Sequence, residues 1–276
     1  MSRPPGRSRS GGRKRLDGTE GDPPGEWLYG LNPVREALAS GRREIHELRV
    51  RTDRGGDREL VGILETVSAR GIPISVRKDA GLGGARPADA ANAQGVALRV
   101  GPLPERSLEE LLAEGPKGHR TLVALDRVED PQNLGAIFRV AEAAGVHGLV
   151  LTRRRAPPLT AAVARASAGA AEWVPVARVA NLTRALDMLK SAGFWVFGAV
   201  LDDAEDLYAL PERALEGDRV VVLGAEGAGI RPGVASALDY RVEIPMHGKV
   251  ASLNVSTAAA VVLFEIRRRR AVATLL

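Results

Sequence analysis

The chain of 276 residues carries 39 Lys and Arg against 34 Asp and Glu, a formal net charge of +5, and it has no cysteine. This length allows one large or two ordinary domains, each with a substantial core. The absence of cysteine excludes disulfides and thiolate metal sites and fits a reducing cytoplasm. The positive charge favours an anionic partner.

The sequence indicates neither a metal site nor a membrane segment. The four histidines are scattered without metal-ligand spacing, and no apolar run reaches the length of a membrane span. We therefore expect a cytoplasmic protein with no bound metal and no membrane partner.

The first 25 residues differ from the rest of the chain. The segment MSRPPGRSRSGGRKR is dominated by Arg, Gly, Ser and Pro and has no acidic residue. Such a segment cannot bury a core, which predicts a disordered basic tail over 1–25. Two interpretations stay open: the tail binds RNA phosphates, or it is a solvated extension without a binding role.

A small α/β unit is predicted over 26–101. The segment NPVREALASG predicts a short helix with Asn32 at its cap and Gly41 at its end. Further patterns predict strands over 45–50, 72–77 and 95–100, a helix over 57–71 and a Gly/Ala-rich loop over 81–94. A linker with a short helix follows over 102–119.

A second α/β unit is predicted over 120–276. Strand patterns lie over 121–126, 147–152, 173–179, 194–200, 219–224 and 240–245. Helix patterns lie over 133–145, 158–170, 181–193, 231–239 and 252–270. Apolar strands that alternate with helices predict a mostly parallel sheet covered on both faces. Ligands of such sheets bind at the carboxyl ends of the strands, where three loops draw attention.

The first of these loops leads into the segment LDRVEDPQNLGAIFRVAEAAG. Asn133 is predicted at the helix cap, after Asp130 and Pro131. An apolar stripe at helical spacing packs this helix on the sheet and leaves Arg139 on the opposite side. Taken alone, Arg139 is either a solvated arginine or a functional one.

The second loop, VVVLGAEGAGIRPG, is rich in glycine but lacks the marks of a phosphate site. No Gly-Lys-Ser/Thr triplet follows, its glycines are spaced G-x-x-G-x-G, and Glu226 would repel a phosphate. A neutral, cationic or hydroxyl-rich ligand fits better, and a plain strand-to-helix turn is equally open. The third loop, IPMHGKVASLNVSTAAAVV, is predicted to enter a long helix with Ser252 as its cap and Asn254 in its first turn.

Taken in order, DPQNLGAIFRVAEAAG, LGAEGAGI and IPMHGKVASLNVSTAAAV resemble the three motifs of the SpoU family of RNA ribose 2′-O-methyltransferases. YGLNPVREAL and AQGVALRV are similar to the small substrate-binding domain of the 23S ribosomal RNA guanosine 2′-O-methyltransferases. The resemblance covers about 26–272. One departure falls in the small domain, where Ala93-Gln94-Gly95 stands in place of the usual His-Gln-Gly.

The resemblance implies a fold and a set of partners. The C-terminal unit would be a mostly parallel sheet with a deep trefoil knot of the SPOUT type, preceded by a small ribosomal-protein-like domain. The cofactor would be S-adenosylmethionine, and the protein would be a homodimer with an active site completed across the interface. The implied divisions are a tail at 1–25, an RNA substrate-binding domain at 26–101, a linker at 102–119 and a methyltransferase domain at 120–276.

The resemblance also carries residue roles. The polar active-site positions are Asn133, Arg139, Glu226 and Asn254. The cofactor-contacting positions are Gly224, Ile244 and Leu253, with Leu223, Met246 and Ser252 nearby. Because a guanidinium stays protonated, we expect Arg139 to bind the adjacent phosphate and orient the hydroxyl rather than act as a base.

Two arginine runs remain. Arg153, Arg154 and Arg155 follow a strand beside the first motif, which favours phosphate binding over a solvated loop. The run at 267–270 ends the last helix, where cations suit the helix dipole.

The favoured hypothesis is a cytoplasmic, S-adenosylmethionine-dependent methyltransferase acting on the ribose of a guanosine in 23S ribosomal RNA. Two alternatives keep the chemistry and change the target: a transfer RNA, or the ribosomal adenosine methylated by thiostrepton-resistance enzymes. A non-catalytic RNA-binding or ribosome-assembly factor is disfavoured by the complete polar set. A dinucleotide-dependent oxidoreductase is disfavoured by the glycine spacing.

Overall fold

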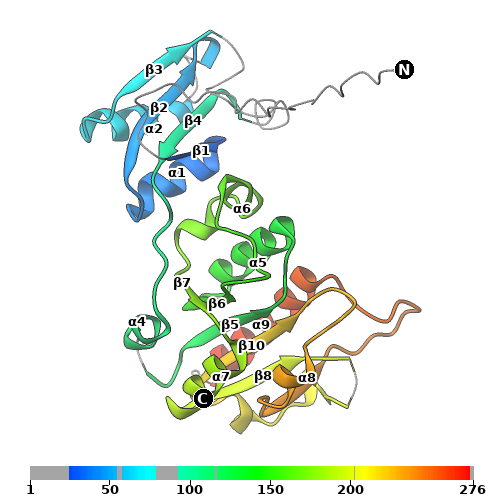
Figure 1. Ribbon diagram of the computed structural model, residues 1–276. Helices are drawn as coiled ribbons and strands as arrows, with labels where there is room; N and C mark the ends of the chain where they lie inside the picture. Colours follow the sequence, from blue (N-terminus) through cyan, green and yellow to red (C-terminus); the bar gives the residue numbers. More distant parts are fainter. Residues whose placement is uncertain (1–24, 55–57, 79–92, 116, 202, 274–276) are drawn as a thin grey trace, which may run out of the picture.

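The computed structural model describes residues 25–54, 58–78, 93–115, 117–201 and 203–273, which form two sheets with helices around them (Figure 1). The predicted basic tail, apart from Gly25, and most of the Gly/Ala-rich loop lie outside the described residues.

The N-terminal sheet has four strands. Their order is β1 (Glu26–Tyr29), β4 (Val96–Val100), β2 (Ile45–Arg51) and β3 (Ile74–Arg77). The β2–β3 pair is parallel, and β4 pairs antiparallel with β1 and β2. Helices α1 (Leu31–Ser40) and α2 (Arg58–Ala69) pack on one face over Leu28, Leu48 and Leu98. The four-residue β1 was not predicted, because it is too short to show an alternating pattern.

Helix α1 begins one residue before the predicted cap. Gly30 occupies the N-cap with φ of 97°, a conformation open to glycine, so Asn32 lies inside the first turn and the prediction for it was wrong. The Leu31 N–H is satisfied by Gln94 Oε1 at 2.9 Å. Gln94 of the AQG segment therefore completes the start of α1 from across the sheet.

A buried network of charges joins the N-terminal sheet to the rest of the chain. Arg43 Nε donates to Glu172 at 2.9 Å, and its Nη1 donates to Glu26 at 2.6 Å. The side chains of Arg43 and Glu172 are at most 1% exposed. Burial raises the pKa of Glu172, against the opposing effect of Arg43. Glu26 also accepts the Ala161 N–H at 2.9 Å, which fixes how the two parts face each other.

The C-terminal sheet has seven strands, all paired in parallel. Their order is β7 (Val176–Val179), β6 (Gly148–Thr152), β5 (Thr121–Asp126), β10 (Asp218–Gly224), β8 (Phe194–Ala199), β11 (Tyr240–Glu243) and β9 (Glu205–Asp206). The chain runs outward from β5 to β7, crosses to β8, and returns to insert β10 beside β5. This confirms the predicted parallel sheet and puts its switch point at the carboxyl ends of β5 and β10.

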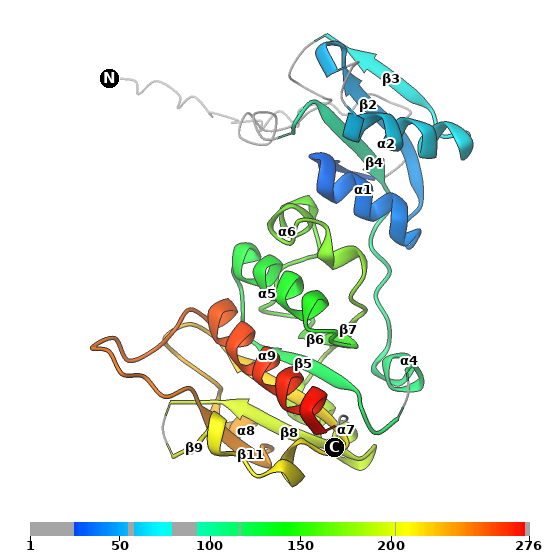
Figure 2. The same ribbon diagram turned by 180° about the vertical axis from the view of Figure 1, so that it is seen from behind.

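Helices cover both faces of this sheet, as predicted. One face carries α5 (Pro131–Ala143), α6 (Ala161–Ala166) and α9 (Val255–Ala273), with α5 and α9 side by side in Figure 2. The other carries α4 (Leu108–Ala113), α7 (Leu182–Ser191) and α8 (Pro232–Ala235). Alternate residues of β5 enter opposite cores, Val123 on the first face and Leu122 on the second.

Short 3-10 turns complete the described chain: η1 (Thr52–Arg54), η2 (Ala170–Glu172), η3 (Leu207–Ala209) and η4 (Glu212–Leu215). In the part of the chain that the structure describes, no helix combines the length and the apolar character needed to cross a membrane.

Two further predicted helix caps, for α5 and α9, were wrong, and both errors bear on the site. Helix α5 starts at Pro131 with Asp130 as its cap, because Asp130 Oδ1 accepts the Gln132 N–H at 2.9 Å. Helix α9 starts at Val255, and Asn254 Oδ1 accepts the Ser256 N–H at 2.8 Å. Asn133 therefore does not cap α5, and its side chain is available for other contacts. Asn254, and not Ser252 as predicted, caps α9.

Candidate active site

The glycine loop after β10 is forced into a tight return. A Cβ on Gly224 would lie 2.1 Å from the carbonyl carbon of Gly229, so no other residue fits without moving the backbone. Ala225 and Gly229 exchange backbone hydrogen bonds of 3.2 and 2.9 Å, and Gly227 and Gly229 have positive φ. The loop thus folds back on itself and holds Glu226 at its tip.

This loop is anchored to the neighbouring strand. Asp126, the last residue of β5, is fully buried and accepts the Arg231 backbone N–H at 2.9 Å. The Arg231 guanidinium donates back to the same carboxylate, at 2.8 Å from Nε. A two-point contact of this kind fixes orientation as well as distance. The contact ties the exit of the glycine loop to the end of β5.

A cavity opens over the carboxyl ends of β8, β10 and β11. All six residues expected to contact the cofactor line it: Leu223, Gly224, Ile244, Met246, Ser252 and Leu253. Ala199, at the end of β8, and Val200 and Leu201, which follow it, also line the cavity and were missed. Their position at the carboxyl end of a strand of the parallel sheet was the signal that could have found them. The lining is mostly apolar or backbone, with Glu226 at one side, which suits a largely apolar ligand bearing a positive charge.

Three of the four expected catalytic residues form one hydrogen-bonded cluster. Glu226 Oε1 accepts from Asn133 Nδ2 at 3.0 Å and from Asn254 Nδ2 at 2.5 Å. Asn254 Nδ2 also donates to Asn133 Oδ1 at 2.9 Å. The Oδ1 of Asn254 accepts from the Ser256 hydroxyl. The cluster draws on α5, the glycine loop and the start of α9. Glu226 Oε2 has no hydrogen-bond donor among the described residues, so one carboxylate oxygen faces a potential ligand.

Arg139 is not part of this cluster. It lies on the exposed side of α5, opposite the buried stripe, as the helical spacing predicts. Six residues separate it from Asn133, which places it about 9 Å further along the helix axis. No hydrogen bond or ion pair joins Arg139 to a residue that the structure describes. Within one chain, Arg139 and the cluster are therefore separate features.

A polar depression adjoins the cavity on its other side. It is lined by Asn133 of the cluster and by charges of both signs: Arg127 and Arg155 against Glu129, Asp130 and Glu226. Both arginines have positive φ, 62° and 59°, which costs a non-glycine residue roughly 1–2 kcal/mol. Arg155 was predicted as an RNA-binding residue, whereas Arg127 was missed although it directly follows β5. Glu226 therefore stands at the boundary between an apolar cavity and a polar surface that carries both signs of charge.

The other two arginines of the predicted RNA-binding run are exposed on the same loop after β6. Arg154 lines a second depression together with Arg127, Arg155 and Arg231. Arg153 lines a third, larger cleft. In the described ranges, no group of three His, Cys, Asp or Glu side chains is arranged to hold a metal ion.

Comparison with known proteins matches this fold and site. The SpoU rRNA Methylase family model matches residues 120–264, and a model for RNA 2′-O ribose methyltransferase substrate binding matches residues 27–106. The 23S rRNA (guanosine-2′-O-)-methyltransferase RlmB of Vibrio cholerae is 38% identical over 248 residues, which are 89% of this chain and 97% of the relative. RlmB of Vibrio vulnificus is 37% identical over the same shares.

Solved structures agree with the sequence matches. The AdoMet-bound rRNA methyltransferase of Sinorhizobium meliloti aligns with a TM-score of 0.71 at 27% identity, over 88% of this chain and 87% of that one. The α/β fold and these matches define the class of protein, a methyltransferase that acts on RNA. The chain belongs to the SpoU family of RNA ribose 2′-O-methyltransferases. It is an enzyme that uses S-adenosylmethionine to methylate ribose 2′-hydroxyls in RNA.

Proposed function

We propose that this enzyme methylates the ribose of a guanosine in 23S ribosomal RNA. Two relatives that align over 89% of the chain, the RlmB proteins of the two Vibrio species, carry that activity in their names. The observation that supports a catalytic role for the site is the position of Glu226, which lines both the apolar cavity and the polar depression. A methyl donor on one side and a ribose on the other would meet at that carboxylate.

The cavity fits the cofactor, and its residues have separable tasks. S-adenosylmethionine, when bound, supplies an activated methyl group on a positively charged sulfur. Leu223, Ile244 and Leu253 would exclude water from its adenosine part, and the Gly224 backbone would approach it closely. The Glu226 carboxylate at the cavity wall would stabilise a nearby cation.

The polar cluster would prepare the nucleophile. Asn133 and Asn254 hold Glu226 through its Oε1, which leaves Oε2 to accept a hydrogen bond from the ribose 2′-hydroxyl. As the hydroxyl oxygen bonds to the methyl carbon, the carbon–sulfur bond breaks and the hydroxyl proton passes to Glu226 or to water. Alignment of the two reactants would supply a large part of the rate enhancement.

We propose that Arg139 acts on the active site of a partner subunit. Its exposed position on α5, away from the cluster of its own chain, supports this role. A permanently protonated guanidinium would bind the phosphate beside the target ribose. The protein would then be a homodimer whose two sites are each built from both chains.

We propose a deep trefoil knot formed by the glycine loop and by the loop at 244–254, which projects from the body of the protein in Figure 1. We keep the division into a tail at 1–25, a substrate-binding domain at 26–101, a linker at 102–119 and a methyltransferase domain at 120–276. An enzyme that modifies ribosomal RNA would work in the cytoplasm, where ribosomes are assembled.

A methyl-transfer assay tests the target. The protein and methyl-labelled S-adenosylmethionine are incubated separately with undermethylated 23S RNA, 16S RNA and transfer RNA, and the modified nucleoside is identified by mass spectrometry. The proposal expects 2′-O-methylguanosine in 23S RNA alone. Labelled transfer RNA or 2′-O-methyladenosine would contradict the target while leaving the chemistry intact.

A mixed dimer tests the shared site. Arg139→Ala and Asn254→Ala homodimers should each be inactive while still binding the cofactor. A heterodimer that carries one variant on each chain has one site with both defects and one intact site, so co-expression with two affinity tags should restore methyl transfer. If the heterodimer stays inactive, Arg139 serves its own chain.

A further inference from the structure

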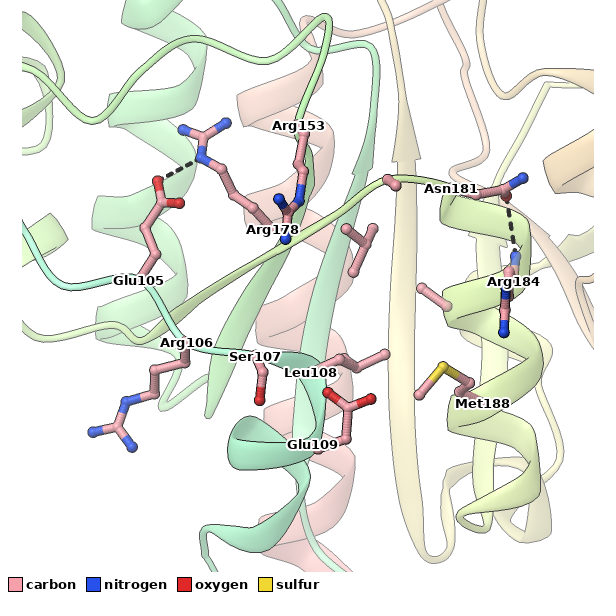
Figure 3. Close-up of a pocket in the computed structure, with 13 residues that line it drawn as sticks. Glu105, Arg106, Ser107, Leu108, Glu109, Arg153, Arg178, Asn181, Arg184 and Met188 are labelled. Carbon is pink, nitrogen blue, oxygen red and sulfur yellow. Dashed lines mark hydrogen bonds and ion pairs between the residues drawn. The ribbon is translucent and has the colours of Figure 1, made fainter.

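A large cleft lies away from the catalytic cluster, between the segment at 105–109 and helix α7. Its volume is about 660 Å³. Figure 3 shows its two walls, with Glu105 to Glu109 on one side and Arg184 and Met188 on α7 on the other. Arg153 comes from the loop after β6 and points into the space between them.

This cleft is continuous with the active site through shared walls. The polar depression beside Glu226 shares Arg127 and Arg155 with the second depression, and the second shares Ala180 and Asn181 with the cleft. A single surface path therefore leads from the cluster, past Arg154, to the cleft. The middle of this path is lined by four arginines and no carboxylate, an arrangement suited to phosphates, whereas carboxylates accompany the arginines at its two ends.

The linker wall of the cleft is held firmly. The Arg106 N–H donates to the Val176 carbonyl at 2.8 Å, so the linker pairs with the edge strand β7. Arg178 Nε donates to Glu105 at 2.5 Å, and its Nη2 donates to the Pro157 carbonyl at 2.7 Å. The linker thus forms a fixed wall, and Arg178 is occupied in holding it.

Two arginines of the cleft are left for a ligand. Arg178 is engaged by Glu105, and Arg106 forms an ion pair with Glu114. Arg153 and Arg184 are exposed, and neither side chain makes a hydrogen bond or ion pair with a residue that the structure describes. The Arg153 N–H donates to the Val179 carbonyl at 2.8 Å, which fixes where this side chain starts.

The position of Arg184 points to an anion. It occupies the first turn of α7, where the helix dipole disfavours a cation, and that turn has no acidic residue. A phosphate placed between Arg184 and Arg153 would offset the unfavourable interaction between the Arg184 cation and the helix dipole. The partly exposed Met188 on the α7 wall supplies apolar surface against which a base or ribose can pack.

We propose that the cleft between 105–109 and α7 is a second RNA subsite. It holds a nucleotide of the substrate strand away from the methylated ribose, with its phosphate between Arg153 and Arg184 and its base against Met188. The inference rests on the proposed function, because it needs an RNA substrate at the catalytic cluster. The linker would then connect the two domains and also bind the RNA that both contact.

Steady-state kinetics with the double variant Arg153→Gln/Arg184→Gln tests the subsite. The KM for RNA should rise roughly tenfold with kcat unchanged, since the cleft touches no reacting atom. The slope of log affinity against log salt should fall by about 0.7, because the subsite neutralises one phosphate and each such contact on a single strand contributes about 0.7. Arg213→Gln, an exposed arginine of η4, is the matched control and should change neither.

The comparison is made on whichever RNA the wild-type enzyme methylates, so an error in the proposed target does not obscure the result. On a short RNA that contains only the target nucleotide and its nearest neighbours, the double variant and the wild type should have the same KM. An unchanged KM and salt slope on the full substrate, or an equal loss on the short RNA, would overturn the proposal.

Cross-linking gives an independent test. The chain has no cysteine, so Met188→Cys introduces a single thiol that can carry a photoreactive azidophenacyl group. Illumination with full-length substrate should cross-link the modified protein to one region of the RNA. That region should be several nucleotides away from the methylated nucleotide. Glu212→Cys, at the amino edge of the sheet, is the control and should not cross-link there. Methylation without a Met188→Cys cross-link would contradict the subsite.

Discussion

The seven parallel strands all begin at one side of their sheet, here called the amino edge, and end at the other, the carboxyl edge. These two edges are built in different ways. At the amino edge, buried charged side chains contact a carboxylate or backbone carbonyls. Arg120 donates to Asp218 from its backbone N–H at 2.7 Å and from Nε at 3.0 Å, and both side chains are nearly inaccessible. The fully buried Arg219 donates to the Gly217 carbonyl at 2.6 Å, and its Nε and Nη1 have no hydrogen-bond partner among the described residues. Burial, reinforced by the charge of Arg270, lowers the pKa of Arg219 to about 10.

At the carboxyl edge, the same sheet carries open or strained groups. Arg127 and Arg155 have positive φ, Glu226 keeps one oxygen without a donor among the described residues, and Arg153 extends into a cleft. Backbone strain and incomplete pairing cost stability, so they persist only where the surrounding fold supports them. The comparison indicates that the amino edge stabilises the fold and the carboxyl edge binds and reacts.

The largest expected effect lies at the amino edge. Asp218→Ala would leave the buried Arg120 without its partner, and the free energy of unfolding should fall by roughly 3–5 kcal/mol. Thermal unfolding should show a matching drop in Tm, while the folded fraction keeps its kcat and KM. Asp53→Ala, which breaks the exposed pair with Arg51, is the control and should leave Tm unchanged. A normal Tm with impaired catalysis would contradict the division between the edges.

A change at the carboxyl edge should instead impair catalysis and leave the thermal stability unchanged. Glu226→Gln keeps an oxygen for Asn133 and Asn254 but removes the negative charge and the proton acceptor. We expect kcat to fall by roughly 10²–10⁴, with Tm unchanged and cofactor binding largely retained. Methyl-transfer kinetics and calorimetry measure these quantities. Glu142→Gln, an exposed carboxylate on α5, should be neutral, and an equal loss there would show that net charge is responsible.

Much of the fold, and the segments that form the site, could be predicted from the sequence. Alternating apolar strands and helices predicted the parallel sheet, and the strand-end rule pointed to the loops that carry Asn133, Glu226 and Asn254. The caps of α5 and α9 were wrong because Pro131 starts one helix earlier and Asn254 starts the other later than the local pattern suggests. The sequence offers several neighbouring residues that could cap each helix. Here the packing of three loops determines which of them does so.

Other features depend on contacts that no local pattern shows. The Asp126–Arg231 contact joins residues 105 positions apart, and the Arg43–Glu172 pair joins residues 129 apart. The positive φ of Arg127 could not be predicted, because a non-glycine residue rarely adopts it. Single-sequence reasoning therefore found which segments form the site, whereas tertiary contacts set how their side chains meet.

A smaller effect tests whether the carboxyl edge trades stability for binding. Arg127→Gly should relieve a strain of roughly 1–2 kcal/mol and lose roughly 0.5–1 kcal/mol through the freedom of glycine in the unfolded chain. Stability should therefore rise slightly, by about 0.5–1 kcal/mol, while the KM for RNA increases. Arg58→Gly, at the first turn of α2, should only destabilise. A destabilised Arg127→Gly protein would mean that the arginine side chain supports the fold.

The smallest effect concerns pH and returns to the amino edge. Burial lowers the pKa of His147 below its usual 6.5, and the charges of Arg270 and Arg120 act in the same direction. Its Nδ1 accepts the Thr121 N–H at 3.2 Å, a contact that needs the neutral ring.

Since the unfolded chain takes up this proton more readily, the unfolding free energy should be constant above pH 6.5 and decline as the pH falls below it. His147→Asn keeps an acceptor near the Nδ1 position and cannot titrate, so Tm measured from pH 8 to 5.5 should decline less steeply than in the wild type. The two proteins should differ little in that slope above pH 7. Equal slopes below pH 6.5 would show that His147 does not contribute, and that other groups at this edge account for any loss on acidification.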